Sequence, residues 1–506
     1  TAPSRAACDA LFHHAGLAWP GSRRDGSGLR AGDRTIAFVA PDACGQDHPV
    51  ADLLLVDEAA GIPAPLLTAL LERYPRLVFA TTVHGYEGTG RGFDLRFRQT
   101  LDRLTPHWRG LTLESPIRWA VGDPLESLVR RALLLDAAPA SAAAPAGIRP
   151  GTWPCERLDR DRLAVDDATL GQVFGLLVLA HYQTRPLDLR LLLDAPGVRV
   201  LVLRDPAQGR VVATLIAVEE GGMTDPDLLR AVYDGRRRPR GHLLPQTLSA
   251  HGGLLEAPRL RYLRVIRIAV HPAFTREGCG RRLLRGLFRQ ARADGVDLLG
   301  SSFGATPDLI AFWSACGYLP AQIGTSRNAA SGEHALVVLR RASRQGAAFA
   351  AAAGRRFEAR LAVLLPGPLR RLDPTVAAAL IAALGAPGVD ESVDPTDAGE
   401  LRSFSDGYRT LEAVLPALAA ATRRGLVPAL RSGRVSPVEA ALLAAAAAQL
   451  RPVGELVGLF QATGRAGLIQ SLREITGRLP TRPRQPDLRS PSPRGRTWRR
   501  LGQCLN

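Results

Sequence analysis

The sequence of 506 residues contains no lysine and a single methionine, Met223. The absence of lysine excludes a complete G-x-x-x-x-G-K-[ST] phosphate loop within these residues, because the lysine of that loop reaches the β- and γ-phosphates of a nucleotide. The six cysteines lie far apart without a C-x-x-C pair, a spacing that fits neither a zinc site nor a disulfide framework. A reducing cytosol is therefore the simplest compartment for this chain.

Long hydrophobic runs are also missing. No uninterrupted apolar stretch reaches the roughly 18 residues that a membrane-spanning helix needs. No basic segment followed by an apolar one indicates a secretory signal. Because the sequence starts at Thr1, we expect a processed or truncated chain. Together these features predict a cytoplasmic protein without a membrane partner.

The basic charge is carried by arginine, and the formal net charge is +17 at pH 7. A preference for arginine over lysine is typical of a GC-rich genome, but it does not explain the excess of basic over acidic residues. An excess of this size indicates a polyanionic partner, with nucleic acid ahead of an acidic membrane surface.

Composition and pattern divide the chain into five segments. Residues 1–136 and 155–342 alternate strand-like and helix-like stretches, which predicts an α/β fold with a parallel sheet in the first segment, including strands at 36–40, 52–56 and 77–81. The stretch 137–154 is rich in Ala, Pro and Gly and reads as a linker. Residues 343–480 are rich in Ala and Leu and predict helices, and residues 481–506 read as a flexible basic tail.

The stretch 53-LLLVDEAAGIP-63 ends an apolar strand in Asp57 and Glu58. This pattern is typical of a nucleotide-driven motor, in which one carboxylate holds Mg²⁺ and the next acid orients a water molecule. We expect no other metal site.

The stretch 266-IRIAVHPAFTREGCGRRLLRGLF-288 predicts a strand, a short loop and an amphipathic helix. Gly278 and Gly280 let the backbone approach an anion, and the helix N-terminus offers free N–H groups. Arg276, Arg281 and Arg282 add positive charge. The pattern predicts a pyrophosphate cradle, with an ordinary surface strand–turn–helix as the alternative.

This stretch resembles motif A of the GCN5-related acetyltransferases (GNAT), whose loop reads [QR]-x-x-G-x-[GA]. Thr275 stands where Gln or Arg is usual. The stretch 308-DLIAFWSACGY-318 resembles motif B of the same enzymes, which closes the coenzyme site. The two resemblances imply that the chain binds acetyl-CoA.

Three further blocks, 79–97 beside 57-DEAA-60, 116–136 and 235–253, resemble the tRNA(Met) cytidine acetyltransferase family. That family fuses an RNA-helicase-like ATPase to a GNAT domain. It transfers acetyl from acetyl-CoA to N4 of the wobble cytidine in the anticodon loop of elongator tRNA(Met), driven by ATP or GTP hydrolysis with Mg²⁺.

The resemblance implies a domain for each segment. Residues 1–136 are expected to form a partial RecA-like motor, 155–342 a GNAT domain and 343–480 a helical tRNA-binding region. In the family, the phosphate loop precedes a strand of the type 1-TAPS-4, so the chain is expected to lack the N-terminal part of the motor. For that reason nucleotide binding by this chain is left open.

The resemblance also implies site residues. Arg118 matches a nucleotide-contacting arginine. Asp308 stands where the family has Glu, and Ala315 stands where it has Arg. The implied coenzyme contacts are Ile268, Ala269, Val270, Thr275, Arg276, Glu277, Gly278, Cys279, Gly280, Arg281 and Asp308.

His271 is the candidate general base. The lone pair of cytosine N4 is delocalised into the ring and N4 is neutral at pH 7, so a base must take an N–H proton as the amine attacks, and N–H donors must stabilise the oxyanion. His271 follows the coenzyme strand and titrates near neutrality. The alternative is that it caps the strand end structurally.

Four arginines in 235-GRRRPRGHLLPQTLSAHGG-253 are candidates for binding RNA phosphates: Arg236, Arg237, Arg238 and Arg240. The alternative is a solvated loop. Two rival functions stay open at this point. One is a GNAT enzyme that acetylates proteins or small amines, and the other is a non-catalytic protein that binds or remodels RNA.

Overall fold

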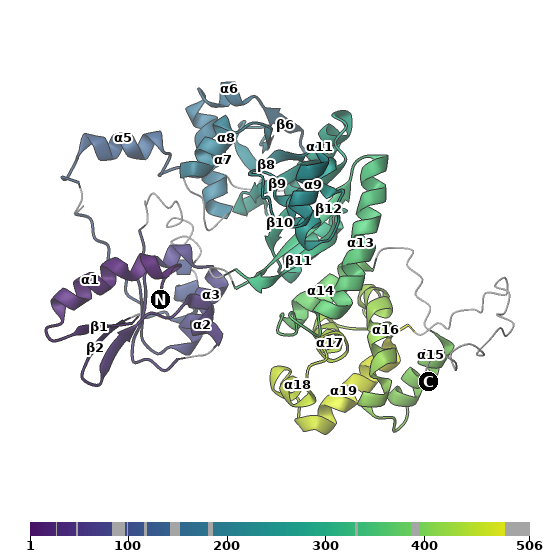
Figure 1. Cartoon of the computed structure of the whole chain (residues 1–506). Helices are drawn as coiled ribbons and strands as arrows, with labels where there is room; N and C mark the ends of the chain where they lie inside the picture. Colours follow the sequence, from purple (N-terminus) through teal and green to yellow (C-terminus); the bar gives the residue numbers. More distant parts are fainter. Residues whose placement is uncertain are drawn as a thin grey trace, which may run out of the picture. The chain divides into compact units, whose positions relative to one another are not determined.

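The computed structural model of the protein describes residues 1–26, 28–46, 49–82, 97–98, 100–115, 119–141, 152–180, 186–328, 332–385 and 394–480. The chain forms two compact units, Thr1–Arg360 and Leu361–Asn506 (Figure 1). The boundary between them falls inside a helix, α13 (Arg344–Leu364), rather than at the predicted position after residue 342.

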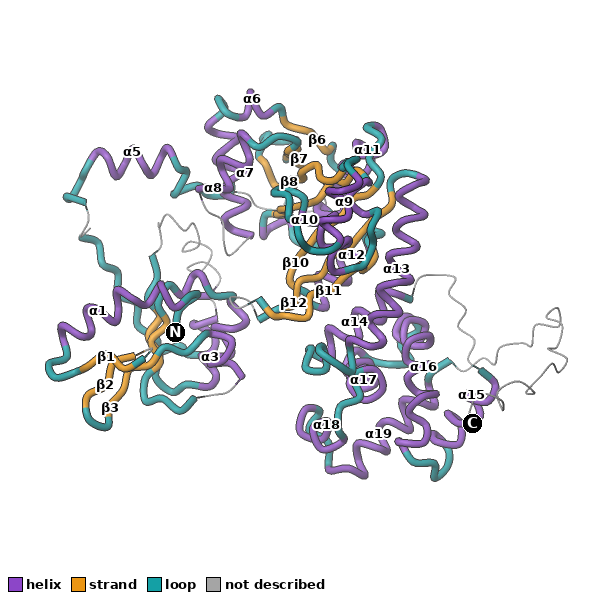
Figure 2. The backbone as a smooth tube through the Cα atoms, viewed as in Figure 1, coloured by secondary structure: helices purple, strands orange, loops and turns teal. Residues whose placement is uncertain are grey.

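The first α/β part contains two small sheets. Its elements are η1 (Arg5–Cys8), α1 (Asp9–Ala18), β1 (Arg23–Asp25), β2 (Gly28–Ala31), β3 (Arg34–Ala37), α2 (Pro41–Gln46), β4 (Leu54–Val56), η2 (Ala59–Gly61), α3 (Ala64–Arg73), β5 (Leu77–Phe79) and α5 (Pro124–Ala132). Strands β1, β2 and β3 form one sheet (Figure 2). Strands β4 and β5 form the other.

The prediction of a parallel strand at 36–40 is wrong. Ile36 lies in β3, which pairs antiparallel with β2. The two strands are joined by the two-residue turn Gly32-Asp33, and Gly32 has a φ of 60°. Glycine at the first position of such a turn favours a hairpin, so the local turn chemistry overrides the α/β pattern.

The predicted parallel strands at 52–56 and 77–81 are confirmed as β4 and β5, which pair in parallel. Thr1 lies beside β4. Its ammonium group donates to Leu55 O at 2.8 Å, and Asp57 N donates to Thr1 O at 2.9 Å, which is the parallel ladder pattern. Helix α3 covers the pair with Leu67 and Leu70, which are fully buried.

A seven-stranded sheet forms the centre of the second α/β part. Its strand order is β11-β12-β10-β9-β8-β7-β6, and only β9 and β10 pair in parallel. The strands are β6 (Cys155–Leu158), β7 (Val198–Arg204), β8 (Val211–Gly221), β9 (Arg261–Val270), β10 (Leu298–Gly304), β11 (Leu319–Arg327) and β12 (His334–Arg341). The connecting helices are α6 (Arg160–Leu163), α7 (Asp167–Ala180), α8 (Pro186–Asp194), α9 (Pro226–Tyr233), α10 (Leu243–Gln246), η4 (Thr247–His251), η5 (Ala257–Arg259), η6 (Pro272–Phe274), α11 (Cys279–Ala293) and α12 (Pro307–Ala315).

Helices α7 and α11 cover opposite faces of this sheet. Val200 and Val202 of β7 pack with α7 in one apolar cluster. Leu201 points to the other face, because side chains alternate along a strand, and there it lies beside Gly286 of α11. The position that a Cβ would take at Gly286 is already filled by Cys155 Sγ, so glycine lets α11 approach the sheet closely.

The first residues of the predicted linker, from Ala137 on, are packed against other parts of the chain. Ala137 belongs to the α7 cluster, and the backbone of Ala138 fills the space where Gly175 would carry a side chain. Arg210 donates to Ser141 O. The first part of this segment is therefore packed against the seven-stranded sheet, while residues 142–151 lie outside the described part of the chain.

The second unit is helical, as predicted. After α13 it contains α14 (Pro374–Leu384), α15 (Pro395–Ser405), α16 (Leu411–Arg431), α17 (Pro437–Leu443), η7 (Ala444–Ala448), α18 (Val453–Leu459) and α19 (Gly464–Arg478). The buried Gln449 donates through Nε2 to the carbonyls of Leu369, Arg370 and Leu372 at 3.2, 3.1 and 2.7 Å. These bonds fix the turn before α14 against the residue that follows η7. The predicted basic tail, 481–506, is not described.

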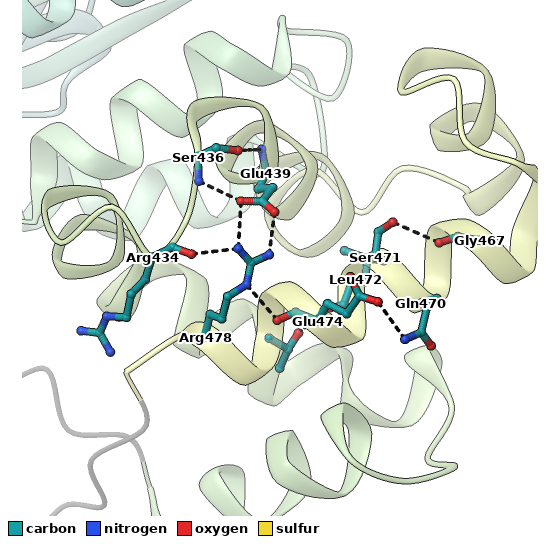
Figure 3. A network of polar contacts seen from close by, with 10 residues as sticks. Arg434, Ser436, Glu439, Gly467, Gln470, Ser471, Leu472, Glu474 and Arg478 are labelled. Atoms are coloured by element: carbon teal, nitrogen blue, oxygen red, sulfur yellow. Dashed lines mark hydrogen bonds and ion pairs between the residues drawn. The ribbon is translucent and has the colours of Figure 1, made fainter.

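Figure 3 shows the polar network that joins α17 and α19. Arg478 Nη2 lies 2.5 Å from Glu439 Oε1, and Arg478 Nη1 donates to Arg434 O at 3.0 Å. Glu439 also completes a capping box, because Ser436 N donates to Glu439 Oε2 at 2.8 Å and Glu439 N donates to Ser436 Oγ at 3.3 Å. The hydrogen bond from Arg478 lowers the pKa of Glu439.

We expect Glu439→Ala to lower the free energy of unfolding of the helical unit by about 1–2 kcal/mol, from the lost cap and a partly screened ion pair. Because the folded pKa of Glu439 is depressed, its contribution is present above the unfolded value of about 4.3 and is lost as the pH falls through the folded value. Urea denaturation at pH 7 and at pH 3 measures this difference. Arg423→Ala, at an exposed guanidinium group of α16 without an ion pair among the described residues, is the control within the same unit, and an equal effect of the two variants contradicts the assignment.

Candidate active site

Strands β9 and β10 separate part of the way along their length. Their parallel pairing runs from Leu298 opposite Tyr262 to Ser301 opposite Val265. Strand β9 continues to Val270 on β8 alone, and β10 continues to Gly304 on β12 alone. The facing backbone edges of 266–270 and 302–304 therefore have no strand partner between them. Such N–H and C=O groups are available to an extended ligand.

A β-bulge accompanies this separation. Ile216 of β8 pairs with Arg267, but the next residue, Ala217, pairs with Val265, so Ile266 is the extra residue of β9. A bulge bends the strand that carries it. Here it lies where the pairing with β10 ends.

The loop after β9 leads into a helix start with free amides, and the predicted strand, loop and helix are confirmed. Gly278 caps α11 with a φ of 82°, and Arg276 also has a positive φ of 68°. The first helical bond joins Arg282 N to Gly278 O at 3.0 Å. Among the described residues, the N–H groups of Gly278, Gly280 and Arg281 donate to no group, and that of Cys279 contacts only its own thiol. They form a positive end suited to an anion.

Helix α12 packs beside this start. A Cβ on Gly280 would lie 3.2 Å from Phe312 Cζ, so only glycine leaves both the helix contact and the amide edge undisturbed. Phe303, Trp313 and Tyr318 stack next to Phe312 and stiffen this side. The exposed Asp308 lies in the first turn of α12.

These residues fit the pyrophosphate and the extended arm of acetyl-CoA. The amides after Gly278 suit the pyrophosphate, and Ile268, Ala269 and Val270 lie on the unpaired edge of β9. Thr275 and Glu277 are exposed in the loop. Cys279 is buried, and burial raises the pKa of its thiol to about 11. Because the thiol stays protonated at neutral pH, Cys279 contributes its backbone rather than a nucleophile.

His271 occupies the end of β9, where both edges of its ring are engaged. Its Nδ1 accepts a hydrogen bond from Ala273 N at 3.2 Å, and the ring also hydrogen-bonds to the backbone of Ala140. Partial burial lowers the pKa of His271, so the neutral ring prevails at pH 7. The structure thus shows the cap that the sequence offered as the alternative. Because Nδ1 accepts from Ala273 N, the neutral ring carries its proton on Nε2, so a role as base requires the contact between Nδ1 and Ala273 N to open.

Asp57 and Glu58 follow β4, at the carboxyl end of the parallel strands. Asp57 Oδ1 accepts from Glu58 N at 3.0 Å, and Glu58 has a left-handed backbone with a φ of 48°. Mg²⁺ in nucleotide sites is held by one or two carboxylates together with the phosphates, and this pair fits that requirement. Arg118 lies outside the described residues.

The four predicted RNA-binding arginines follow α9 and are exposed. Arg236 lies 2.9 Å from Asp234. In the described part of the chain, Arg237, Arg238 and Arg240 have no ion pair. The structure therefore places three of the four guanidinium groups free at the surface.

Sequence reasoning missed Glu333, which precedes β12. Its carboxyl group fills the space where Gly304, the last residue of β10, would carry a side chain. Burial raises the pKa of Glu333 above its ordinary value of 4.5. Lone acidic residues in a Gly-rich turn carry no sequence signal for this placement, since it depends on the pairing of β10 with β12.

The described residues lack two features, a membrane-spanning helix and a cluster of metal ligands. No helix there is both long and apolar enough to cross a bilayer. No group of three His, Cys, Asp or Glu side chains gathers there as a metal site.

Comparisons with known proteins agree with this geometry. Residues 1–136 match the family described as RNA cytidine acetyltransferase NAT10/TcmA, helicase domain, and residues 172–294 and 287–343 match GNAT acetyltransferase 2. The tRNA(Met) cytidine acetyltransferase TmcA of Nitrosococcus halophilus is 45% identical over 94% of this chain. The chain belongs to the tRNA(Met) cytidine acetyltransferase family. The TmcA of Pectobacterium atrosepticum is 43% identical over 66% of the chain.

This member of the tRNA(Met) cytidine acetyltransferase family spans 63% of the length of the Nitrosococcus protein and 46% of the Pectobacterium protein. Among solved structures, the ribosomal-protein-S18-alanine N-acetyltransferase from Escherichia coli is similar at 16% identity and a TM-score of 0.25, covering 38% of this chain and 94% of that one.

Proposed function

We propose that this chain transfers the acetyl group of acetyl-CoA to N4 of the wobble cytidine of elongator tRNA(Met), forming N4-acetylcytidine. The observation that carries the proposal is the separation of β9 and β10 beside the free amides of α11. It occurs in a chain whose relatives are named for this reaction. A tRNA substrate also implies a cytoplasmic enzyme.

The coenzyme site uses backbone groups more than side chains. The amides of Gly278–Arg281 hold the pyrophosphate, the edge of β9 at 268–270 orients the arm, and Asp308 lies at the mouth. Thr275 and Ala315 replace the side chains that the family carries, so the grip depends on the backbone. This explains how the site tolerates both replacements.

The acceptor amine must lose a proton during transfer. His271 is the proposed base, and its Nδ1 takes the proton once it is released from Ala273 N. Glu333 is the second candidate, because its partly buried carboxyl group lies at the end of β10 and its pKa is raised toward neutrality. A base works best when its pKa lies near the working pH.

The motor part would couple nucleotide hydrolysis to access of the RNA. In this proposal Asp57 holds Mg²⁺ with ATP or GTP, Glu58 orients water, and Arg118 contacts the nucleotide. The target cytidine lies in the anticodon loop, and it must leave its stack before it can enter a pocket. The helical region 343–480 and the arginines after α9 would bind the tRNA.

One experiment tests the function. The chain is incubated with acetyl-CoA, ATP and total tRNA, and the nucleosides are analysed for N4-acetylcytidine. Acetylation of amines without any RNA would favour the rival GNAT function. Absence of thermal stabilisation by acetyl-CoA would favour a non-catalytic RNA-binding protein.

We expect residues 1–506 to bind Mg²⁺–ATP weakly. The chain contains no lysine, and the lysine and amides of a phosphate loop supply most of the grip on the β- and γ-phosphates. Equilibrium dialysis with labelled ATP measures this. Tight binding that Asp57→Asn abolishes would show that these residues form a complete nucleotide site.

A further inference from the structure

A cavity of about 420 Å³ lies beside the seven-stranded sheet, between the end of α9, the helices α10 and η4, and Arg264 of β9. Its size falls within the usual range for small-ligand sites, roughly 300–1,000 Å³. Arg237 and Arg238 line it, whereas Arg236 and Arg240 of the same segment do not. The candidate RNA-binding arginines are thus divided into two pairs by the structure.

The loop that carries these arginines is fixed at both ends. The N–H groups of Arg236 and Arg237 both donate to Ala231 O of α9, at 2.9 and 3.1 Å. Near the other end of the loop, the side chain of Gln246 donates to Pro239 O. The cavity is therefore a built feature, with a backbone held in place before any ligand binds.

At the inner end of the cavity, the charge of Arg264 is paired with that of Glu220. Glu220 is completely buried, and its carboxylate lies 2.5 Å from Arg264 Nε and accepts from Leu244 N at 2.9 Å. Only Nε of Arg264 takes part in this pair. Its two terminal nitrogens donate to no group among the described residues, and Arg264 lines the cavity.

His242 adds a second donor at the inner end. Its Nδ1 accepts from Gly221 N at 2.9 Å, so the neutral ring carries its proton on Nε2. At the rim, Arg237 and Arg238 are exposed and have no ion pair in the described part of the chain. Apolar side chains, among them Val232 and Leu243, form the rest of the wall.

Unpaired guanidinium groups, an N–H donor and an apolar wall around one cavity match the parts of a nucleotide. Arginine binds phosphate oxygens through two parallel hydrogen bonds, and bases stack on apolar and guanidinium surfaces. Arg264 and Ile268 are four residues apart on β9, roughly 13 Å at the usual rise of a strand. The cavity is therefore close enough to the proposed acetylation site for one RNA strand to contact both.

We propose that this cavity binds one nucleotide of a single-stranded RNA segment, with Arg237 and Arg238 on its phosphate and with Arg264 and His242 on its base or ribose. The identification of that segment as part of the tRNA substrate rests on the proposed function. The binding of RNA by the cavity does not.

The test measures binding of a fluorescently labelled eight-nucleotide RNA with a central cytidine, without acetyl-CoA, at several salt concentrations. Arg237→Gln/Arg238→Gln is the test variant, and Arg236→Gln/Arg240→Gln is its matched control with the same change of charge. We expect the test variant to lose about 0.7 from the slope of log K against log salt, the value for one phosphate contact to a single strand. The control variant is expected to change the slope less.

A second variant tests the cavity itself. Ala250→Trp adds a large side chain to the lining and keeps every arginine, and we expect it to weaken RNA binding as well. Retained stabilisation by acetyl-CoA shows that each variant is folded.

Equal losses in the two arginine variants, or full binding by Ala250→Trp, overturn the proposal in favour of a solvated basic surface. Binding of phosphatidylserine vesicles with the same arginine dependence, without RNA binding, overturns it in favour of a membrane surface. If the wild-type chain makes no N4-acetylcytidine but shows the expected RNA binding pattern, the proposed function fails and the cavity assignment stands.

Discussion

Gly278→Val is expected to abolish measurable binding of acetyl-CoA. Gly278 has a φ of 82° at the start of α11, a conformation that a β-branched residue adopts only at a large cost. Relief of that strain moves the loop, and with it the amides of 278–281 that we propose to hold the coenzyme. We expect the Kd to rise about 100-fold or more, because strain of ~1–3 kcal/mol adds to the loss of several hydrogen bonds to charged groups. Isothermal titration calorimetry with acetyl-CoA measures this.

Gly295→Val is the matched control for this experiment. Gly295 follows the other end of α11 with a φ of 65°, and the nearest side-chain atom to a Cβ there is Arg261 Nη1 at 3.9 Å. The control carries the same kind of backbone strain away from the loop. We expect it to lower the melting temperature and leave the affinity for acetyl-CoA unchanged. If Gly278→Val binds acetyl-CoA like the wild type, the loop is not the coenzyme cradle.

The strands that the sequence predicted well are those buried on both faces. The run 198–204 is apolar apart from Arg199 and Arg204, and it forms β7 with α7 and α11 covering its two sides. The helix after Gly278 was also predictable, since its glycines, arginines and leucines follow one helical period. In each case the local sequence pattern and the tertiary environment favour the same secondary structure.

The elements that the sequence did not predict depend on contacts between distant segments. The separation of β9 from β10 is a matter of register, and no residue in either strand announces where pairing stops. The helices α10 and η4 lie in a stretch with Pro and Gly that reads as a loop. The cavity beside them combines residues from 232 to 264, on several elements, so its arginines looked alike in the sequence and differ only in the fold.

The candidate site likewise contains parts that a local sequence pattern predicts and parts that depend on contacts between distant segments. The proposed coenzyme residues 275–281 are contiguous, and their placement follows from one strand–loop–helix motif. The surroundings of His271 come from Ala140, far away in the sequence, and those of Glu333 come from the pairing of β12 with β10. A candidate base was therefore easy to name from its motif, while its competitor was visible only in three dimensions.

His271→Asn separates the two roles of His271, because an asparagine side chain keeps an oxygen that accepts from Ala273 N but cannot act as a base. If His271 is the base, we expect both His271→Asn and His271→Ala to lower turnover by about 10²–10⁴-fold, the usual range for loss of a general base. Affinity for acetyl-CoA and tRNA should stay nearly constant, since backbone amides and arginines provide it. Burial lowers the pKa of His271, so the lower limb of the wild-type pH–rate profile is expected below pH 6.5 and should vanish in both variants.

Glu333→Gln completes the comparison. Burial raises the pKa of Glu333, so a Glu333 base gives a lower limb above 4.5, which approaches the limb expected for His271. The pH profile of the wild type alone therefore does not distinguish the two bases, and the variants do. Near-normal turnover of His271→Asn together with a loss of about 10²-fold or more in Glu333→Gln assigns proton removal to Glu333 and leaves His271 as the cap of β9. Single-turnover measurement of N4-acetylcytidine formation with saturating acetyl-CoA isolates this step from binding.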